Sequence, residues 1–473
     1  MVDDQLHEEE LESRWEAAPG GGGPVSALLV DLYELTMGQS YFAEGMAERR
    51  ATFSLFCRRL PRGWGYLLAA GLDDALRYLC GLRFTNDDLA YLETTGLFSS
   101  EFLGYLGRLR FTGDVRALPE GTLFFPNEPV LEVTAPVIEA QLAETLVLNQ
   151  VHFQSLIAGK AARCVDAACG RKLVDFALRR AHGYEAGLKV ARSSYLAGFD
   201  ATSNVLAGRE YGIPVAGTMA HSYIECFEDE AAAFRAFTRA YPDGAVLLVD
   251  TYGTAEGTAR AVAIATELSR AGLRLGGVRI DSGDLLEHGR TARRLLDQAG
   301  FPEATVFASG SLDEHEIARL LAADAPIAGF GVGSRLGVAA DAPYLDMAYK
   351  LVEFDGRPVL KLSEGKATLP AAKQVWRYTR KGRFTHDLVG LAEETPPEKA
   401  EPLLATVMTA GRRVHTEPLS TARERANGQR AKLNAETRSL DATPYEVRLS
   451  PPLVALRDSA ATKAARRHGT HWP

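Results

Sequence analysis

Apolar positions in the middle of the chain fall into short runs that recur at fairly even spacing. Six of these runs end in Gly, Ser, Thr, Asp or Arg, and they are "KLVDFALRRAHG", "IPVAGTMAHS", "AVLLVDTYGT", "LGGVRIDSGDL", "ATVFASGSLDE" and "IAGFGVGSRLG". Helical patterns such as "LLEHGRTARRLLDQAG" separate several of them. A spacing of roughly 25–30 residues is typical of repeated strand–helix units with buried parallel strands. The pattern therefore predicts an α/β unit whose polar strand ends meet at one edge of a sheet.

The chain on either side of this unit has a less regular pattern. Before it, strand-like runs such as "ATFSLFCRRL" and "GTLFFPNEPVLEVTAP" mix with helical stretches such as "GLDDALRYLCGL", which indicates an α+β arrangement. A long helical stretch, "VIEAQLAETLVLNQVHFQSLIAGKAARCVDAA", follows them as one helix or two. After the α/β unit, strands return in "AYKLVEFDGRPVLKL", and a helix is expected near 417–438.

Composition narrows the class of protein. With 473 residues, 46% of them apolar and 24% charged, the chain is typical of a soluble globular protein with more than one domain. The net charge of −8 argues against a general nucleic-acid binder, so an anionic ligand needs local cations and backbone N–H groups. The five cysteines show no CxxC spacing, which fits the reducing cytosol and offers no zinc site. Without a signal-peptide pattern or an apolar run of about 18 residues, we expect a cytoplasmic protein that does not enter membranes.

Two polar strand ends carry residues suited to phosphate, sugar or metal. In "GVRIDSGDL", Arg279 can fork onto a phosphate and Asp281 can hold Mg²⁺ or a ribose hydroxyl, although a structural ion pair is an equal alternative. In "IAGFGVGSRLG", Gly331, Gly333 and Ser334 can bring backbone N–H groups onto a phosphate. The glycines do not have the spacing of a P-loop, so by themselves they more often form a tight turn.

A histidine and further charged residues follow the other runs. His221 comes just after "IPVAGTMA", and its imidazole can accept a proton or a phosphoryl group near neutral pH. Taken alone, such a histidine is more often structural. Arg179 and Arg180 suit an anion but are more often solvated, and Asp250 is the single acid of its strand end.

Together these stretches resemble the nicotinate phosphoribosyltransferase family. The motifs "DLYELTM", "ALRRA", "GFDATSNVLAG", "GTMAHS", "VDTY", "GVRIDSGDL" and "YKLVE" occur in the family's order between residue 26 and about 375. The resemblance implies an irregular α/β barrel and an α+β domain made from N- and C-terminal segments. The expected parts are a disordered acidic tail (1–24), an N-terminal α+β domain (25–150), a barrel domain (151–342), a returning C-terminal segment (343–455) and a flexible tail (456–473).

The resemblance also implies an activity. The family transfers 5-phosphoribose from phosphoribosyl pyrophosphate (PRPP) to nicotinate, giving nicotinate mononucleotide and pyrophosphate on the salvage route to NAD. It couples this transfer to ATP hydrolysis through a phosphohistidine and uses Mg²⁺. Its members usually form head-to-tail homodimers in which the partner's N-terminal segment closes each site.

Carried onto this chain, the resemblance implies roles for individual residues. His221 matches the phosphorylated histidine and would accept the γ-phosphoryl group of ATP. Arg279 would lie near the base or its ribose phosphates, Asp281 near the ribose and Mg²⁺, and Asp250 would help bind PRPP hydroxyls or the metal. The residues implied for nicotinate are Phe176, Ser203 and, from the neighbouring subunit, Asp31 and Tyr33, while Arg179 would face the nicotinate or the pyrophosphate. The loop around the histidine would include Gly217, Thr218 and Ser222, and the 5′-phosphate loop would include Gly331, Gly333 and Ser334.

Ser203 bears on which pyridine is used. It stands where the related nicotinamide phosphoribosyltransferase carries an aspartate, which would repel a carboxylate. A serine can donate to the carboxylate, so nicotinate is favoured over nicotinamide. The alternatives are a nicotinamide-specific enzyme, a quinolinate phosphoribosyltransferase, and a binding protein that kept the fold and lost activity.

Overall fold

The computed structural model describes residues 25–361 and 368–468. By its internal contacts the chain divides into two compact units, one of residues up to Ala158 together with those from Tyr344 onward, and one of Gly159–Pro343. The boundary between Ala158 and Gly159 falls within helix α7 (Glu144–Ala168). The acidic tail predicted for 1–24 lies outside the described residues.

The second unit contains a parallel sheet of six strands. Their order is β7-β6-β11-β10-β9-β8, and every neighbouring pair is parallel. The strands are β6 (Lys172–Asp175), β7 (Ala201–Thr202), β8 (Ala245–Leu248), β9 (Leu275–Ile280), β10 (Thr305–Ser309) and β11 (Gly329–Val332). Five of the six predicted runs contain one of these strands, so the α/β prediction is confirmed.

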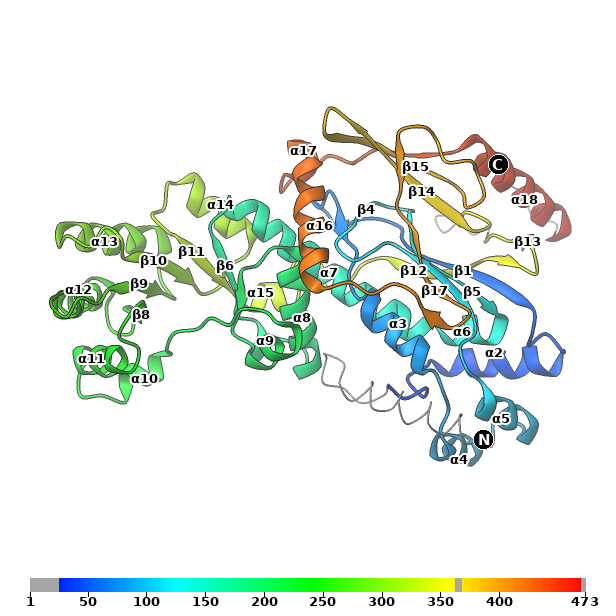
Figure 1. Cartoon of the computed structure of the whole chain (residues 1–473), viewed down its shortest axis with the longest axis horizontal. Helices are drawn as coiled ribbons and strands as arrows, with labels where there is room; N and C mark the ends of the chain where they lie inside the picture. Colours follow the sequence, from blue (N-terminus) through cyan, green and yellow to red (C-terminus); the bar gives the residue numbers. More distant parts are fainter. Residues whose placement is uncertain (1–24, 362–367, 469–473) are drawn as a thin grey trace. The chain divides into compact units, whose positions relative to one another are not determined.

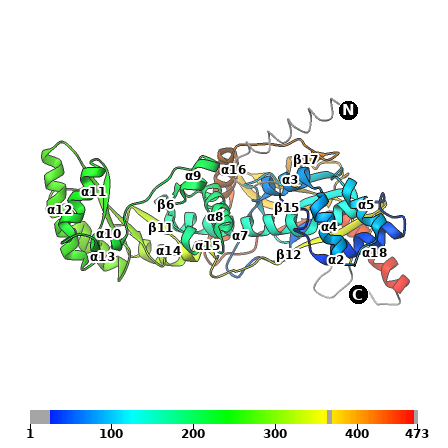
Figure 2. The same ribbon diagram turned by 90° about the horizontal axis from the view of Figure 1, so that it is seen from below.

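Helices connect these strands, as parallel pairing requires. They are α8 (Tyr184–Ala197), α9 (Val205–Tyr211), α10 (His221–Glu225), α11 (Glu230–Ala240), α12 (Thr254–Arg270), α13 (Leu285–Gln298), α14 (Glu314–Ala322) and α15 (Ser334–Gly337). Figures 1 and 2 show α11, α12 and α13 beside the β8 end of the sheet, while α8, α9 and α15 lie at the β6 end. The order of the strands therefore places the residues after β8 and β9 at one side edge of the sheet and those after β6 and β7 at the opposite side edge.

The strand expected in "IPVAGTMAHS" is wrong. The run forms only one bridge, between Thr202 and Val215. Pro214 has no N–H to donate to a ladder, Gly212 has a φ of +66°, and Val215 is 57% exposed. The run therefore lacks both the hydrogen bonds and the burial of a central strand.

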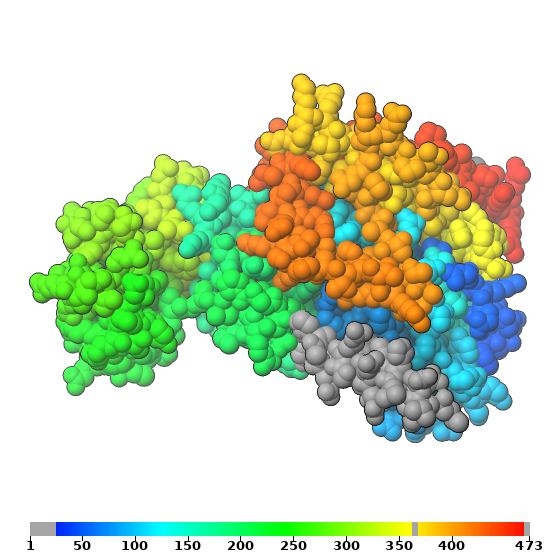
Figure 3. Space-filling view, in the orientation of Figure 1, coloured from blue at the N-terminus to red at the C-terminus, as the bar shows by residue number. Residues whose placement is uncertain are grey.

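The first unit joins the two ends of the chain in one sheet. Its seven strands lie in the order β13-β12-β1-β5-β3-β17-β18. The central strand β1 (Arg50–Cys57) pairs antiparallel with β5 (Pro129–Pro136) from the N-terminal segment and with β12 (Met347–Phe354) from the C-terminal one. Figure 3 shows the same mixture, with yellow and orange atoms next to blue and cyan ones. The α+β prediction, with both segments contributing, is confirmed.

The remaining strands complete this unit. The outer strands of the large sheet are β3 (Asp114–Ala117), β13 (Arg357–Pro358), β17 (Ala405–Thr409) and β18 (Arg412–Arg413). A four-stranded sheet contains β14 (Lys373–Arg380), β15 (Arg383–Leu391), β16 (Ala400–Pro402) and β19 (Val447–Leu449), and β2 (Leu67–Leu68) pairs with β4 (Leu123–Phe124).

The helices of the first unit follow the expected pattern except at the C-terminus. They are α2 (Leu32–Ala43), α3 (Leu72–Gly81), α4 (Asn86–Thr94), α5 (Ser100–Arg108), α6 (Val137–Leu142), α16 (Leu419–Lys432), α17 (Ala435–Arg438) and α18 (Pro451–His468). The long helical stretch is split between α6 and α7, and α16 with α17 occupies the region expected near 417–438. The flexible tail predicted from 456 is wrong as far as 468, because Leu453, Ala461 and Ala465 are buried along one face of α18. Within the described residues, no helix is long and apolar enough to cross a membrane.

Candidate active site

His221 is the first residue of α10 and lies between two strand ends of the parallel sheet. Its Nδ1 is 3.1 Å from Oγ1 of Thr251, which follows β8. Its Nε2 is 3.9 Å from Oδ2 of Asp281, which follows β9. The imidazole is 37% exposed, so it is oriented by these neighbours and still open to a ligand.

The two aspartates next to His221 are linked to each other. Oδ2 of Asp250 accepts hydrogen bonds from the backbone N–H of Asp281 at 2.9 Å and from the Ser282 hydroxyl at 2.7 Å. Oδ1 of Asp281 accepts one from the Ser309 hydroxyl at 2.5 Å. Oδ1 of Asp250 is buried and has no hydrogen-bond partner among the described residues. Because a buried, unsatisfied carboxylate oxygen is costly, this atom is suited to a ligand hydroxyl or a cation.

The number of carboxylates at this position, two, is compatible with Mg²⁺. Among the described residues there is no group of three or more His, Cys, Asp or Glu side chains that could form a cage of protein ligands. Mg²⁺ is usually bound by only one or two carboxylates together with substrate phosphates and water. The free oxygen of Asp250 and the neighbouring Asp281 carboxylate are compatible with that kind of site.

Arg279 lies in β9, beside the same group. Its Nη1 donates to Oγ1 of Thr218 at 2.5 Å, while its Nε is buried without a partner among the described residues. Burial lowers the pKa of Arg279, the carboxylates of Asp281 and Asp250 oppose that shift, and the Arg179 cation adds to it. An arginine remains charged at neutral pH even so, which makes Arg279 a partly unsatisfied cation next to two acids.

A second group of predicted residues lies at the ends of β6, β7 and β11. The backbone N–H of Phe176 donates to the Val332 carbonyl at 2.8 Å, and that of Ser203 donates to the Asp175 carbonyl at 2.8 Å. Gly331 lies inside β11, and a Cβ on it would come within 2.4 Å of the Phe176 ring. The missing side chain of Gly331 is therefore explained by packing, and its predicted contact with a phosphate stays a prediction.

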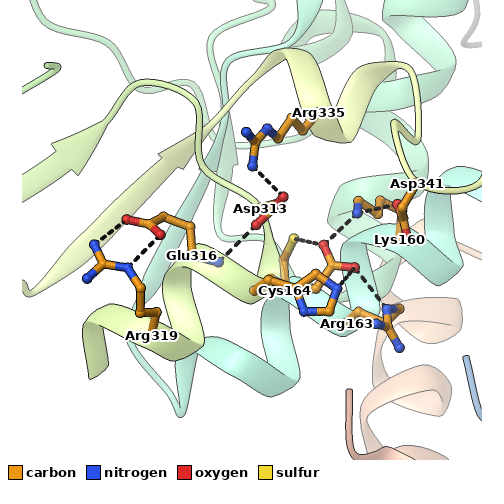
Figure 4. A network of polar contacts seen from close by, with 10 residues as sticks. Lys160, Arg163, Cys164, Asp313, Glu316, Arg319, Arg335 and Asp341 are labelled. Carbon is orange, nitrogen blue, oxygen red and sulfur yellow. Dashed lines mark hydrogen bonds and ion pairs between the residues drawn. The ribbon is translucent and has the colours of Figure 1, made fainter. Parts of the chain in front are cut away.

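The segment after β11 is held by ion pairs, as Figure 4 shows. Arg335, next to Ser334, donates to Oδ2 of Asp313 at 2.6 Å, and Asp313 also caps α14. Further along the segment, Asp341 pairs with the buried Lys160 at 2.5 Å, and Lys160 pairs with Glu314 at 2.6 Å. These contacts fix the predicted phosphate loop at both ends.

Asp31 and Tyr33 belong to the first unit. Asp31 is at the N-cap position of α2, and its carboxylate accepts from the Thr145 hydroxyl at 2.8 Å. Tyr33 is 46% exposed, and partial burial together with the acids Glu144 and Glu34 raises its pKa. The ring is therefore neutral and accessible, as a stacking residue needs to be.

Comparison with known proteins identifies the family. Residues 28–152 match the nicotinate phosphoribosyltransferase N-terminal domain, 171–379 the nicotinate phosphoribosyltransferase family and 395–457 its C-terminal domain. The chain is 52% identical over 447 residues, 94% of each chain, to nicotinate phosphoribosyltransferase pncB2 of Mycobacterium tuberculosis. The chain belongs to the nicotinate phosphoribosyltransferase family.

Solved structures agree with this family. The chain resembles the human nicotinic acid phosphoribosyltransferase structure with a TM-score of 0.80 and 32% identity, over 91% of this chain and 99% of that one. It also resembles a nicotinate-nucleotide pyrophosphorylase from Pyrococcus furiosus, with a TM-score of 0.71 and 26% identity, over 86% and 95% of the two chains.

Some of the predicted residues contact one another directly, whereas others only share a loop with them. His221, Thr218, Arg279, Asp281 and Asp250 form one set of neighbouring residues. Gly217 and Ser222 lie in the same loop and helix start, where a Cβ on Gly217 would meet no atom within 4 Å. Packing inside the protein therefore does not require glycine at 217.

Sequence reasoning missed three polar residues of the site. They are Asp175, Thr251 and Ser309, and each contacts a predicted site residue or one of its loops. Each stands at or just after the end of a parallel strand, which is the signal that could have found them.

Proposed function

We propose that this protein transfers 5-phosphoribose from PRPP to nicotinate, giving nicotinate mononucleotide and pyrophosphate for NAD salvage. The observation that carries the proposal is the convergence of His221, Arg279, Asp281 and Asp250 at neighbouring strand ends in a chain of this family. The names of the relatives support the same reaction.

The residues present suit the chemistry of this transfer. The pyridine nitrogen is the nucleophile and is unprotonated near neutral pH, so no catalytic Ser or Cys is required. The protein has to hold a polyanion and favour positive charge at the ribose carbon as pyrophosphate leaves. Arg279 and Arg179 provide cations for the anionic groups, and Asp281 and Asp250 can accept from ribose hydroxyls. Asp281 and Asp250 would hold Mg²⁺, which would supply positive charge that offsets the charge of the pyrophosphate.

We further propose that His221 couples the reaction to ATP. The γ-phosphoryl group of ATP would pass to an imidazole nitrogen with release of ADP, and hydrolysis of the phosphohistidine would later release phosphate. The contact with Thr251 and the nearby Asp281 support this role, because they orient a ring that is still accessible.

The proposed enzyme is a homodimer located in the cytoplasm. Support for the dimer comes from exposed apolar side chains in each unit. In the second unit they include Leu178, Tyr184, Val205, Leu206 and Val215, and in the first unit Leu29, Leu32 and Tyr33. Exposed apolar side chains of this kind often mark protein interfaces.

The deciding experiment compares three pyridines in one assay. Purified protein with PRPP and Mg²⁺ is given nicotinate, nicotinamide or quinolinate, each with and without ATP, and the mononucleotide is quantified. We expect product from nicotinate, faster with ATP, and little from the other two. Preference for nicotinamide or quinolinate would replace the proposed substrate, and no product from any pyridine would favour a binding protein without this activity.

A further inference from the structure

Asp175 is a buried carboxylate at the end of β6 that has no part in the reaction proposed above. It is 1% exposed. Its Oδ1 accepts from the backbone N–H of Ala177 at 2.8 Å, and its Oδ2 accepts from the Thr202 hydroxyl at 2.7 Å. Its backbone carbonyl accepts from the N–H of Ser203 at 2.8 Å. One residue therefore connects the turn after β6 to the end of β7.

Burial disfavours the ionised form of the Asp175 carboxylate. Burial raises the pKa of Asp175 to about 6, and the hydrogen bonds from Thr202 and Ala177 only partly oppose the shift. No ion pair to Asp175 exists in the part of the chain that the structure describes. An asparagine would be cheaper to bury, but it has one acceptor oxygen where the two donors here need two.

Both segments held by Asp175 carry residues assigned to the pyridine. The turn from 175 to 177 contains Phe176 and leads to Arg179, and Thr202 directly precedes Ser203. From this geometry we infer that Asp175, through Thr202, is a positioning residue that sets the distance between Phe176 and Ser203 for binding nicotinate. This inference rests on the proposed function. It adds a group that touches no substrate but decides how well the pyridine is held.

The inference predicts a much larger effect on nicotinate than on PRPP. Arg279, Asp281 and Asp250 are in or after β8 and β9, and two strands, β11 and β10, separate β6 from β9 in the sheet. The predicted 5′-phosphate loop after β11 neighbours β6, but the ion pairs of Arg335 and Asp341 hold it independently of Asp175. Loosening the turn after β6 should therefore weaken nicotinate binding and leave PRPP binding almost unchanged. A residue that merely stabilised the sheet edge would lower stability without this selectivity.

Asp200 provides a matched control. Its Oδ2 accepts from the backbone N–H of Leu173 at 2.9 Å, so it also bridges the β6 and β7 segments, at the opposite end of the same strand pair. Asp200→Asn alters a bridge of the same two strands at the end away from Phe176 and Ser203.

The test measures KM for nicotinate, KM for PRPP, kcat and melting temperature in Asp175→Ala, Thr202→Val, Thr202→Ser and Asp200→Asn. We expect Asp175→Ala and Thr202→Val to raise the nicotinate KM about tenfold and to keep the PRPP KM within about twofold. Thr202→Ser retains the hydroxyl and should behave like the wild type, and Asp200→Asn should change only the melting temperature. The double variant Asp175→Ala/Thr202→Val should be no worse than Asp175→Ala alone.

Other results would overturn the inference. A wild-type nicotinate KM in Thr202→Val, which preserves side-chain volume and should fold even if Asp175→Ala does not, would remove the role of the contact. An equal rise in both KM values, or the same nicotinate effect in Asp200→Asn, would make Asp175 purely structural. Failure of the wild-type protein to form nicotinate mononucleotide would instead overturn the proposed function, and the positioning role with it.

Discussion

At the scale of single residues, the two oxygens of the Asp250 carboxylate differ in their surroundings. One oxygen accepts two hydrogen bonds from residues 281 and 282, whereas the other is buried without a partner among the described residues. The Arg279 side chain shows the same asymmetry, with Nη1 bonded to Thr218 and Nε unsatisfied. Unsatisfied polar atoms of opposite charge on adjacent residues of one sheet edge are expected where a polar ligand completes the hydrogen bonding.

Replacing His221 tests the proposed coupling to ATP. His221→Ala removes the imidazole next to Thr251 and Asp281, so we expect loss of ATP-stimulated turnover by at least about a hundredfold, with PRPP binding largely retained. Incubation with labelled ATP followed by mass spectrometry should find a phosphoryl group on His221 in the wild type and none in the variant. Full ATP stimulation in His221→Ala would remove the assigned role.

Glu34 makes stability depend on pH. The residue is fully buried, its Oε1 accepts from Thr145, and burial raises its pKa to about 7, with Glu144 and Asp31 adding to the shift. In the unfolded chain Glu34 ionises at lower pH, so the folded state loses stability as pH rises from about 4.5 to about 7, and the loss is complete above that.

The corresponding substitution should therefore stabilise the protein only at higher pH. Glu34→Gln cannot ionise, and we expect a gain in the free energy of unfolding of about 2 kcal/mol at pH 8, less than the full pKa shift implies because local relaxation around the ionised carboxylate lowers its cost. No gain is expected near pH 4.5. Urea unfolding at the two pH values measures the effect, with the exposed Glu44→Gln at the end of α2 as control. An equal gain at both pH values would contradict this explanation.

At the scale of elements, α7 and α14 are joined by charges rather than by apolar side chains alone. Glu314 at the start of α14 is fully buried and pairs with Lys160 and Arg163 of α7. Removing one member of a buried ion pair leaves the other charge uncompensated. The pairing therefore fixes the register of the two helices and, through Asp341, of the segment that follows α15.

A comparison of two neighbouring acids of α14 tests this connection. Glu314→Gln should lower the free energy of unfolding by about 3 kcal/mol, because Lys160 and Arg163 lose a shared anion. Glu316→Gln breaks a pair with Arg319, which is 54% exposed, and should cost less than about 1 kcal/mol. Chemical denaturation of both variants measures the difference. Similar losses in the two would mean that the buried network contributes no more than a surface pair.

At the scale of the whole molecule, the exposed apolar residues predict a second subunit. Val205 is 74% exposed at the start of α9, close in sequence to Ser203. We expect a dimer by light scattering, and Val205→Glu should weaken the dimer about tenfold or more because it places a charge in an apolar contact. A wild-type monomer at micromolar concentration would contradict the proposed dimer.

Several features could be predicted from the sequence alone because they depend on local patterns. Apolar runs ending in polar residues gave β6, β8, β9, β10 and β11, and the chemical types of Arg279, Asp281 and His221 identified them as candidates. The strand around Val215 was predicted wrongly, because a mostly exposed apolar run that forms a single bridge resembles a strand by composition. The helix of 451–468 was missed because its few buried residues contact parts of the chain distant in sequence.

The sequence by itself determined which side chains were available and, except for His221, that they stand at strand ends, because both follow from residue order and from the geometry of parallel strands. Only the tertiary structure decided which of these ends are neighbours. The order β7-β6-β11-β10-β9-β8 brings Asp281 next to Asp250 and His221, and brings Asp175 to Thr202. The tertiary structure also decided that the seven-stranded sheet combines the N-terminal and C-terminal segments of the chain. These pairings depend on hydrogen bonds and burial between distant segments, which no local pattern specifies.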